Sequence, residues 1–81
     1  MKYAELNDES LVMLTLSGEA AAYEVLVVRY QKAVLAAAQT VTHSAYLAED
    51  AAQDAFVTAW MKLNVLRDPS KYGGWVCRIA G

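Results

Sequence analysis

Cationic, hydroxyl and aromatic side chains gather within twelve residues near the end of the chain: Arg67, Ser70, Lys71, Tyr72, Trp75 and Arg78. Arginine and lysine hold phosphates, and flat aromatic rings stack on unpaired bases. Tyr72 and Trp75 are three residues apart, so both can project from one side of a helix, and the two glycines between them would let a strand approach the backbone closely. The group predicts a surface for single-stranded nucleic acid, and Lys62 lies close enough in sequence to extend it.

The sequence also predicts how exposed three of these residues should be. Lys71 and Tyr72 should be largely accessible on a loop at one end of the molecule, and Trp75 should be partly buried. An alternative uses the same residues for packing: Trp75 and Ile79 would fill the core, and Gly73-Gly74 would be part of a turn. Both roles for Trp75 stay open on sequence alone, because a tryptophan has a large apolar body and a polar edge.

A second group lies on one face of a predicted helix, where residues recur at spacings of three and four. Its members are Asp50, Gln53, Asp54, Val57 and Met61. A core disfavours the carboxylates and the amide, so these should face water or a partner. An acidic patch with an apolar margin suits docking against a basic helical surface. The alternative is a solvated helix face whose acidic residues are favoured by the helix dipole.

Nothing in the chain predicts catalysis, a metal site or a cofactor. His43 is the single histidine and falls in a predicted polar turn, where we expect it to be solvated. Cys77 is the single cysteine, so an intrachain disulfide and a paired-cysteine metal site are both excluded. We expect Cys77 to be a small core residue. No nucleophile–base pair or phosphate-binding glycine motif is present, and the chain is predicted not to be an enzyme.

The first two helices are predicted from caps and apolar spacing. Asn7 is an expected N-cap ahead of two acidic residues, and Gly18 should end this short helix in the left-handed conformation. A second helix should run over about 19–41. Its apolar stripe recurs at alternating spacings of four and three, at Tyr23, Val27, Tyr30, Val34, Ala37 and Val41.

The third and fourth helices follow a polar turn at 42–44. The third should run over about 45–66, with a packing seam at Ala48, Ala52, Ala55, Ala59, Leu63 and Leu66. After a turn over 67–70, Asp68 is an expected N-cap with Pro69 in the first helical position. No strand is predicted. The expected fold is all-α: a small bundle of three main helices plus a short N-terminal helix.

Composition and charge agree with one small helical domain. The chain has 81 residues, 57% of them hydrophobic, and only one proline and four glycines. Its net charge of −2 is unevenly distributed: residues 1–54 carry three basic and eight acidic side chains, whereas residues 55–81 carry four basic and one acidic. Such asymmetry suggests two faces with different partners, and the alternative is a chance division of charge in a small helical protein. No secretion signal and no apolar stretch long enough to span a bilayer is present, and we expect a cytoplasmic protein without membrane insertion.

Three segments in the same order and register resemble region 2 of the extracytoplasmic-function sigma factors. They are YEVLVVRY at 23–30, AEDAAQDAFVTAW at 48–60 and WVCRIA at 75–80. The family consensus for the second segment is A-E-D-x-x-Q-[ED]-x-F-x-x-A-[WY], and the consensus for the third is W-L-x-R-I-A-x-N. The likeness covers nearly the whole chain.

The resemblance implies a role in bacterial transcription initiation. In the family, the helix matching 47–66 docks on the clamp helices of the RNA polymerase β′ subunit, and Asp50, Gln53 and Asp54 match polar positions of that contact. The segment matching 67–75 binds the non-template strand of the −10 promoter element and holds one base flipped out of the duplex. Flipping a base in this way loses a few kcal/mol of stacking. An anti-sigma factor is a further implied partner.

The chain departs from the family pattern at two places. Gly73-Gly74 stands where the family has larger residues, and the family asparagine would fall just past Gly81. We therefore expect a region 2 domain over residues 1–81 that is cut short at its C-terminal end, without the region 4 domain that reads the −35 element. The main alternative is a protein-interaction helical bundle that makes no DNA contact.

Overall fold

The computed structural model describes residues 2–81, and no strand occurs in that range. Four α-helices make up the fold: α1 (Asp8–Leu16), α2 (Ala20–Thr42), α3 (Ala45–Met61) and α4 (Tyr72–Ala80). Three single 3₁₀ turns connect or precede them: η1 (Tyr3–Glu5), η2 (Leu63–Val65) and η3 (Pro69–Lys71). The expected all-α class is confirmed.

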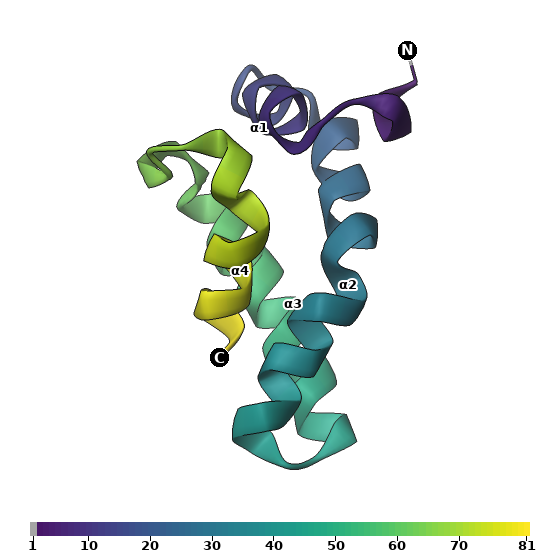
Figure 1. Ribbon diagram of the computed structural model, residues 1–81, viewed down its shortest axis with the longest axis vertical. Helices are drawn as coiled ribbons and strands as arrows, with labels where there is room; N and C mark the ends of the chain where they lie inside the picture. The colour runs from purple at the N-terminus through teal and green to yellow at the C-terminus, as the bar shows by residue number, and fades with distance from the viewer. Residues whose placement is uncertain (1) are drawn as a thin grey trace.

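The long helices α2 and α3 form an antiparallel hairpin, and the other two helices are arranged around it (Figure 1). α4 packs against both members of the hairpin, while α1 lies across the end of α2 that is far from the hairpin turn. The connection between α3 and α4 passes beside α1, because η2 and η3 both contact that helix. The segment predicted to bind nucleic acid therefore begins at the α1 end of the molecule.

The ends of α1 are capped as its sequence predicts. The Asn7 side chain accepts a hydrogen bond from the Ser10 backbone N–H at 2.8 Å, which satisfies a free donor of the first turn. At the other end, Gly18 has a φ of 109°. The Gly18 N–H bonds to the Thr15 carbonyl and the Glu19 N–H to the Leu14 carbonyl, both at 3.0 Å. This is the Schellman pattern, in which a glycine reverses the chain after the helix.

The hairpin turn between α2 and α3 contains the single histidine. His43 has a φ of 56°, and its N–H donates to the Gln39 carbonyl, so it closes α2 in the left-handed conformation. The Ser44 side chain then caps α3 by accepting from the Leu47 N–H. His43 is exposed, as expected for a turn residue.

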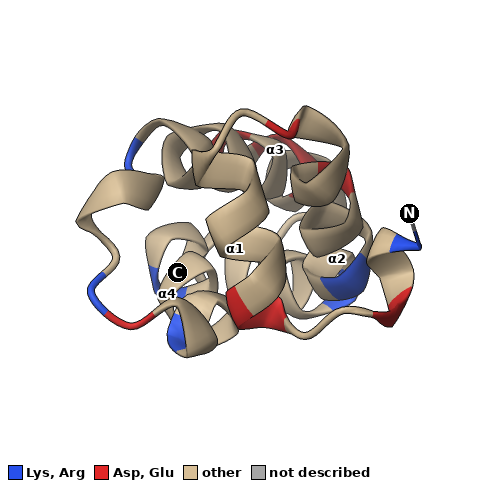
Figure 2. Ribbon diagram, turned by 90° about the horizontal axis from the view of Figure 1, so that it is seen from above, with Lys and Arg blue, Asp and Glu red and all other residues tan. Residues whose placement is uncertain are grey.

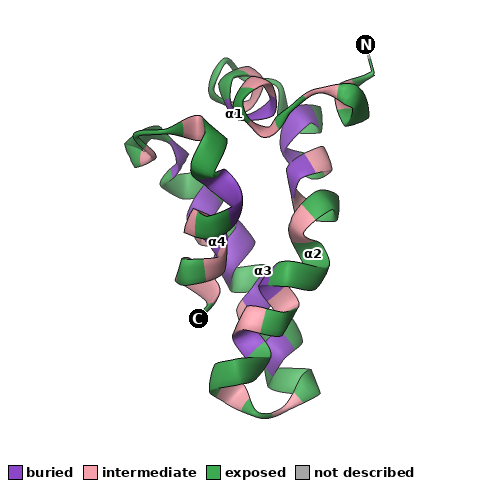
Figure 3. Ribbon diagram, in the orientation of Figure 1, coloured by how far each residue is buried: buried purple, intermediate pink, exposed green. Residues whose placement is uncertain are grey.

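The core lies where α1, α2, α3 and α4 meet, and the far end of the hairpin is more exposed (Figure 3). The largest fully buried side chains are Tyr72, Leu11, Leu26, Leu63, Val12, Val34 and Val76. The predicted α2 stripe is wrong at its end, because Val41 is 57% exposed. The buried side chains of α2 include two members of the stripe, Tyr23 and Val34, together with Ala22, Leu26 and Ala38. Val41 lies in the last turn of α2, at the exposed end of the hairpin.

The third helix is shorter than predicted. α3 ends at Met61 and the chain tightens into η2 instead of continuing as an α-helix to Leu66. Asn64 and Val65 are weak helix formers, so little opposes this change. Leu63 remains on the core side and is buried against α1 and α3, whereas Val65 is exposed. The seam prediction is thus confirmed for Leu63, although the helix that was expected to carry it is not continuous.

Candidate docking and nucleic-acid surfaces

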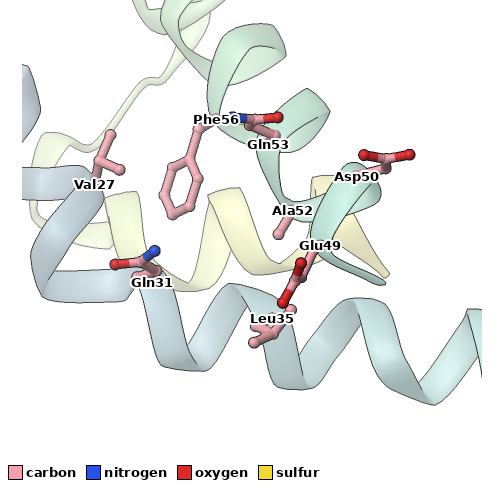
Figure 4. A pocket seen from close by; sticks show the side chains of 8 residues that line it. All are labelled: Val27, Gln31, Leu35, Glu49, Asp50, Ala52, Gln53 and Phe56. Atoms are coloured by element: carbon pink, nitrogen blue, oxygen red, sulfur yellow. The ribbon is translucent and has the colours of Figure 1, made fainter. Parts of the chain in front are cut away.

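A groove runs between α2 and α3 on the side where the acidic group lies. Its cavity measures about 490 Å³ and is lined by Val27, Gln31, Leu35, Glu49, Asp50, Ala52, Gln53 and Phe56. The Phe56 ring points into the space between the two helices, with Val27 and Gln31 facing it from α2 (Figure 4). The Asp50 carboxylate points away from α2 toward solvent (Figure 4). The groove therefore has an apolar floor and a polar, acidic edge.

The five residues predicted to meet a partner form one exposed face of α3, here called the docking face: Asp50, Gln53, Asp54, Val57 and Met61. Val57 is 57% and Met61 73% exposed, although both are apolar. Neither aspartate takes part in an ion pair within residues 2–81. Unpaired carboxylates beside uncovered apolar side chains give a surface that can exchange water for a basic, partly apolar partner.

Sequence reasoning missed the residues that α2 and the end of α3 add to this surface. A second hollow of about 390 Å³ continues the groove past Phe56 and includes Val57 and Trp60. Trp60 is 44% exposed and makes an edge-on contact with Tyr23, with ring centroids 4.8 Å apart. Gln31 offered a signal in the sequence, because it is a polar residue four positions after Val27 and so lies on the same side of the helix as that member of the apolar stripe.

The predicted nucleic-acid cations lie on a different part of the molecule, here called the basic edge: Lys62, Arg67, Lys71 and Arg78. All four are exposed, and none forms an ion pair with another described residue. Figure 2 shows basic segments of the α3–α4 connection and of α4 on the side of the molecule opposite the N-terminus. Free guanidinium and ammonium groups on one side are available to phosphates.

A local hydrogen-bond motif shapes the middle of the basic edge. The Asp68 side chain accepts from the Ser70 N–H at 3.1 Å and from the Ser70 hydroxyl at 2.6 Å. These bonds from Ser70 lower the pKa of the Asp68 carboxyl. Asp68 is therefore an N-cap as predicted, but it caps η3, which runs directly into α4. The Ser70 hydroxyl proton is held by Asp68, so only the oxygen of this predicted site residue is free to accept a bond.

Tyr72 corrects the prediction for the nucleic-acid surface. It was expected to be solvent-exposed, but its side chain is 0% exposed. Its hydroxyl donates to the Tyr23 hydroxyl at 3.0 Å, and Tyr23 in turn donates to the Phe56 carbonyl at 2.6 Å. A phenol with this relay can be buried without leaving an unsatisfied polar group. Tyr72 fixes the start of α4 to the hairpin and offers no ring surface to a base.

Burial also shifts the titration of this pair. The pKa of Tyr72 is raised chiefly because burial disfavours the charged phenolate, and the bond to Tyr23 adds to the effect. Burial likewise raises the pKa of Tyr23, although the bond received from Tyr72 opposes that change. Both phenols therefore stay protonated and keep their hydrogen bonds at neutral pH.

The neighbouring glycine is needed for close packing. Gly73 is buried, and a Cβ added to it would lie 2.4 Å from a ring carbon of Tyr30. Tyr30 is held in place because its hydroxyl donates to the Asp8 carboxylate, which also pairs with Arg29 at 2.8 Å. The contact explains why a glycine stands where larger residues were expected from the family.

Trp75 is half-buried, as predicted, and lies beside Tyr72 with ring centroids 6.2 Å apart. The two alternatives for Trp75 are therefore not exclusive, because part of the ring packs on the core and part is accessible. Cys77 is also half-buried and packs against the core. Within residues 2–81, no group of histidine, cysteine and carboxylate side chains is arranged to hold a metal ion. Nor does that range contain a helix with the length and apolarity needed to cross a membrane.

Comparisons with known proteins agree with these features. The model of the Sigma-70 region 2 family matches residues 26–81. The chain is 36% identical over 74 residues to the RNA polymerase sigma-H factor of Pseudomonas aeruginosa, and the alignment covers 91% of this chain but 38% of that relative. No solved structure gives a significant match. The resemblance found in the sequence is confirmed, and the chain belongs to the Sigma-70 region 2 family, whose members are transcription initiation factors and not enzymes.

Proposed function

We propose that the chain is the part of a bacterial sigma factor that joins core RNA polymerase to the −10 promoter element. The docking face would bind the clamp helices of the β′ subunit. The basic edge, together with the accessible part of Trp75, would hold the non-template strand and help to melt the duplex. An anti-sigma factor would act by covering one of these surfaces, and the site of action would be the cytoplasm.

The observation that carries this proposal is the separation of two chemically different surfaces. The docking face is acidic and apolar and belongs to α3, whereas the basic edge belongs to the segment after α3 and to α4. One face suits a basic helical partner and the other suits phosphates. A bundle that bound only protein would need no free cations beside a half-exposed tryptophan.

A charge reversal tests the docking face. Asp54→Lys should weaken capture of core RNA polymerase strongly, because like charges then meet at the interface. Folding should be unchanged, since Asp54 is exposed and unpaired within the described chain. Glu24→Lys is a matched control, because Glu24 is exposed on α2 beside Val25 and Val28, outside the groove. Equal capture by the two variants would show that the docking face is assigned wrongly.

A second arm distinguishes the protein-interaction alternative. Lys71→Ala, in holoenzyme, should weaken binding of a single-stranded −10 oligonucleotide without changing polymerase capture. Lys32→Ala removes an exposed cation from α2 and serves as the control. If neither substitution changes oligonucleotide binding, the alternative of a bundle without DNA contact is preferred.

A further inference from the structure

Two adjacent glycines at the start of α4 have opposite surroundings. Gly73 is buried against Tyr30, and the fold requires it to lack a side chain. Gly74 is exposed, and a Cβ added there would meet nothing within 4 Å. Gly74 also lacks the positive φ that favours glycine over other residues. Neither packing nor backbone conformation therefore requires a glycine at 74. Glycine is also a poor helix former, so its presence there costs helix stability.

The exposed residues around Gly74 offer a reason that concerns binding. Gly74 and Arg78 are both exposed and four positions apart in α4, and exposed Lys71 directly precedes the helix, three positions before Gly74, so the three residues lie in succession along its outer side. Lys71 and Arg78 are separated by about 10 Å along the axis. Between these two free cations the helix presents bare backbone. Trp75, half-buried, flanks the same stretch.

We propose that Gly74 is a close-approach site, where the sugar–phosphate backbone of the single strand lies directly against α4 between Lys71 and Arg78. The strand is held at both ends of the bare stretch by a cation, and a neighbouring base reaches the accessible part of Trp75. The occupant should be an anionic chain, because Lys71 and Arg78 are free cations and α4 carries no acidic residue. Gly74 acts as a positioning residue, since any side chain there would lift the strand off the helix. This inference rests on the proposed role of the basic edge.

The test adds side chains at 74 and measures fold and DNA binding separately. Gly74→Ala should raise the melting temperature, because alanine is the better helix former and has room. Gly74→Leu should keep the fold and polymerase capture but weaken binding of a single-stranded −10 oligonucleotide by holoenzyme by about tenfold, the size of one lost stacking contact. Ala36→Leu, at an exposed position on α2, controls for an added surface leucine and should leave oligonucleotide binding unchanged.

Each outcome separates this inference from the function on which it rests. If Lys71→Ala weakens oligonucleotide binding and Gly74→Leu does not, the basic edge stands and the close approach at Gly74 is wrong. If both leave binding unchanged, the proposed DNA surface fails as well. If Gly74→Leu weakens polymerase capture to the same extent as oligonucleotide binding, its effect is not local to the strand, and the inference is overturned.

Discussion

Two buried tyrosines link three helices through their hydroxyl groups. Tyr72 donates to Tyr23, and Tyr23 donates to the backbone of Phe56, whose ring lines the groove beside the docking face. The edge-on contact between the Tyr72 and Tyr23 rings, with centroids 6.1 Å apart, adds aromatic packing. These two side chains therefore hold the start of α4, and with it the basic edge, at a fixed place on the hairpin.

The hydroxyl and the ring of Tyr72 should contribute unequally to stability. Tyr72→Phe removes one hydrogen bond but leaves the Tyr23 bond to Phe56, so we expect a loss of about 1 kcal/mol of unfolding free energy. Tyr72→Ala removes a fully buried ring and should cost about 3–5 kcal/mol, enough to unfold much of so small a domain. Urea unfolding followed by circular dichroism measures both. Equal losses for the two variants would contradict the assigned burial.

Tyr30 should make the domain sensitive to alkali. Its hydrogen bond to Asp8, aided by burial and by the Asp8 charge, raises the pKa of Tyr30 from 10.0 to about 12. A raised pKa favours the protonated phenol in the folded state, so the stabilisation is complete below pH 10 and is lost as the pH rises toward 12. We expect the unfolding free energy to fall across this interval.

The matched variant is Tyr30→Phe, which keeps the ring against Gly73 but removes the titrating group. Its unfolding free energy should fall less steeply between pH 10 and 12 than that of the unmodified chain. Tyr3, Tyr23 and Tyr72, whose pKa values are also raised, would account for the slope that remains. Identical slopes in the two proteins would exclude a contribution from Tyr30.

Leu63 is the fully buried apolar anchor of the connection between α3 and α4, where Leu66 is only partly buried. Leu63 is 2% exposed and packs between α1 and α3, whereas its neighbour Val65 lies outside the core. Leu63→Ala should lower the unfolding free energy by about 2–5 kcal/mol, because the cavity left behind cannot close fully. Val65→Ala should change it by less than about 0.5 kcal/mol. Thermal unfolding of each variant measures this difference, and an unchanged melting temperature for Leu63→Ala would refute the role of Leu63 as an anchor.

The sequence predicts whole elements here better than their ends. The caps at Asn7 and Gly18 and the stripe through Tyr23 and Val34 located α1 and α2, because these signals are local. The end of α3 could not be found in the same way. It depends on how Leu63 turns toward α1, and a contact between distant segments leaves no mark in helical spacing.

The two candidate surfaces also differed in how well the sequence predicts them, because helical spacing indicates exposure but does not reveal contacts between distant segments. A row of polar residues on α3 indicates exposure directly, and every member of the docking face is exposed. Tyr72 could not be placed, because its amphipathic side chain fits both a wet loop and a core, and the deciding partner is Tyr23, 49 residues away. The pairing of Gly73 with Tyr30 is hidden in the sequence in the same way.

At the scale of the molecule, surface charge should govern binding to DNA. The domain measures 37 × 24 × 17 Å and carries a net charge of −2, so its few free cations work against an acidic remainder. Non-specific duplex binding depends on neutralising phosphates. We therefore expect the 81-residue chain alone to bind duplex DNA weakly in a gel shift at physiological salt. Tight, sequence-specific binding under those conditions would contradict this account of the charge distribution.

The contact between Tyr30 and Gly73 has a consequence for how related sequences can vary. A ring carbon occupies the space that a side chain at 73 would need, so neither position can change freely while the other stays the same. A relative with a larger residue at the position of Gly73 should carry a smaller one, or a differently oriented ring, at the position of Tyr30. The two sites should therefore covary across an alignment, although they are 43 positions apart, whereas the residue at Gly74 should vary independently of both.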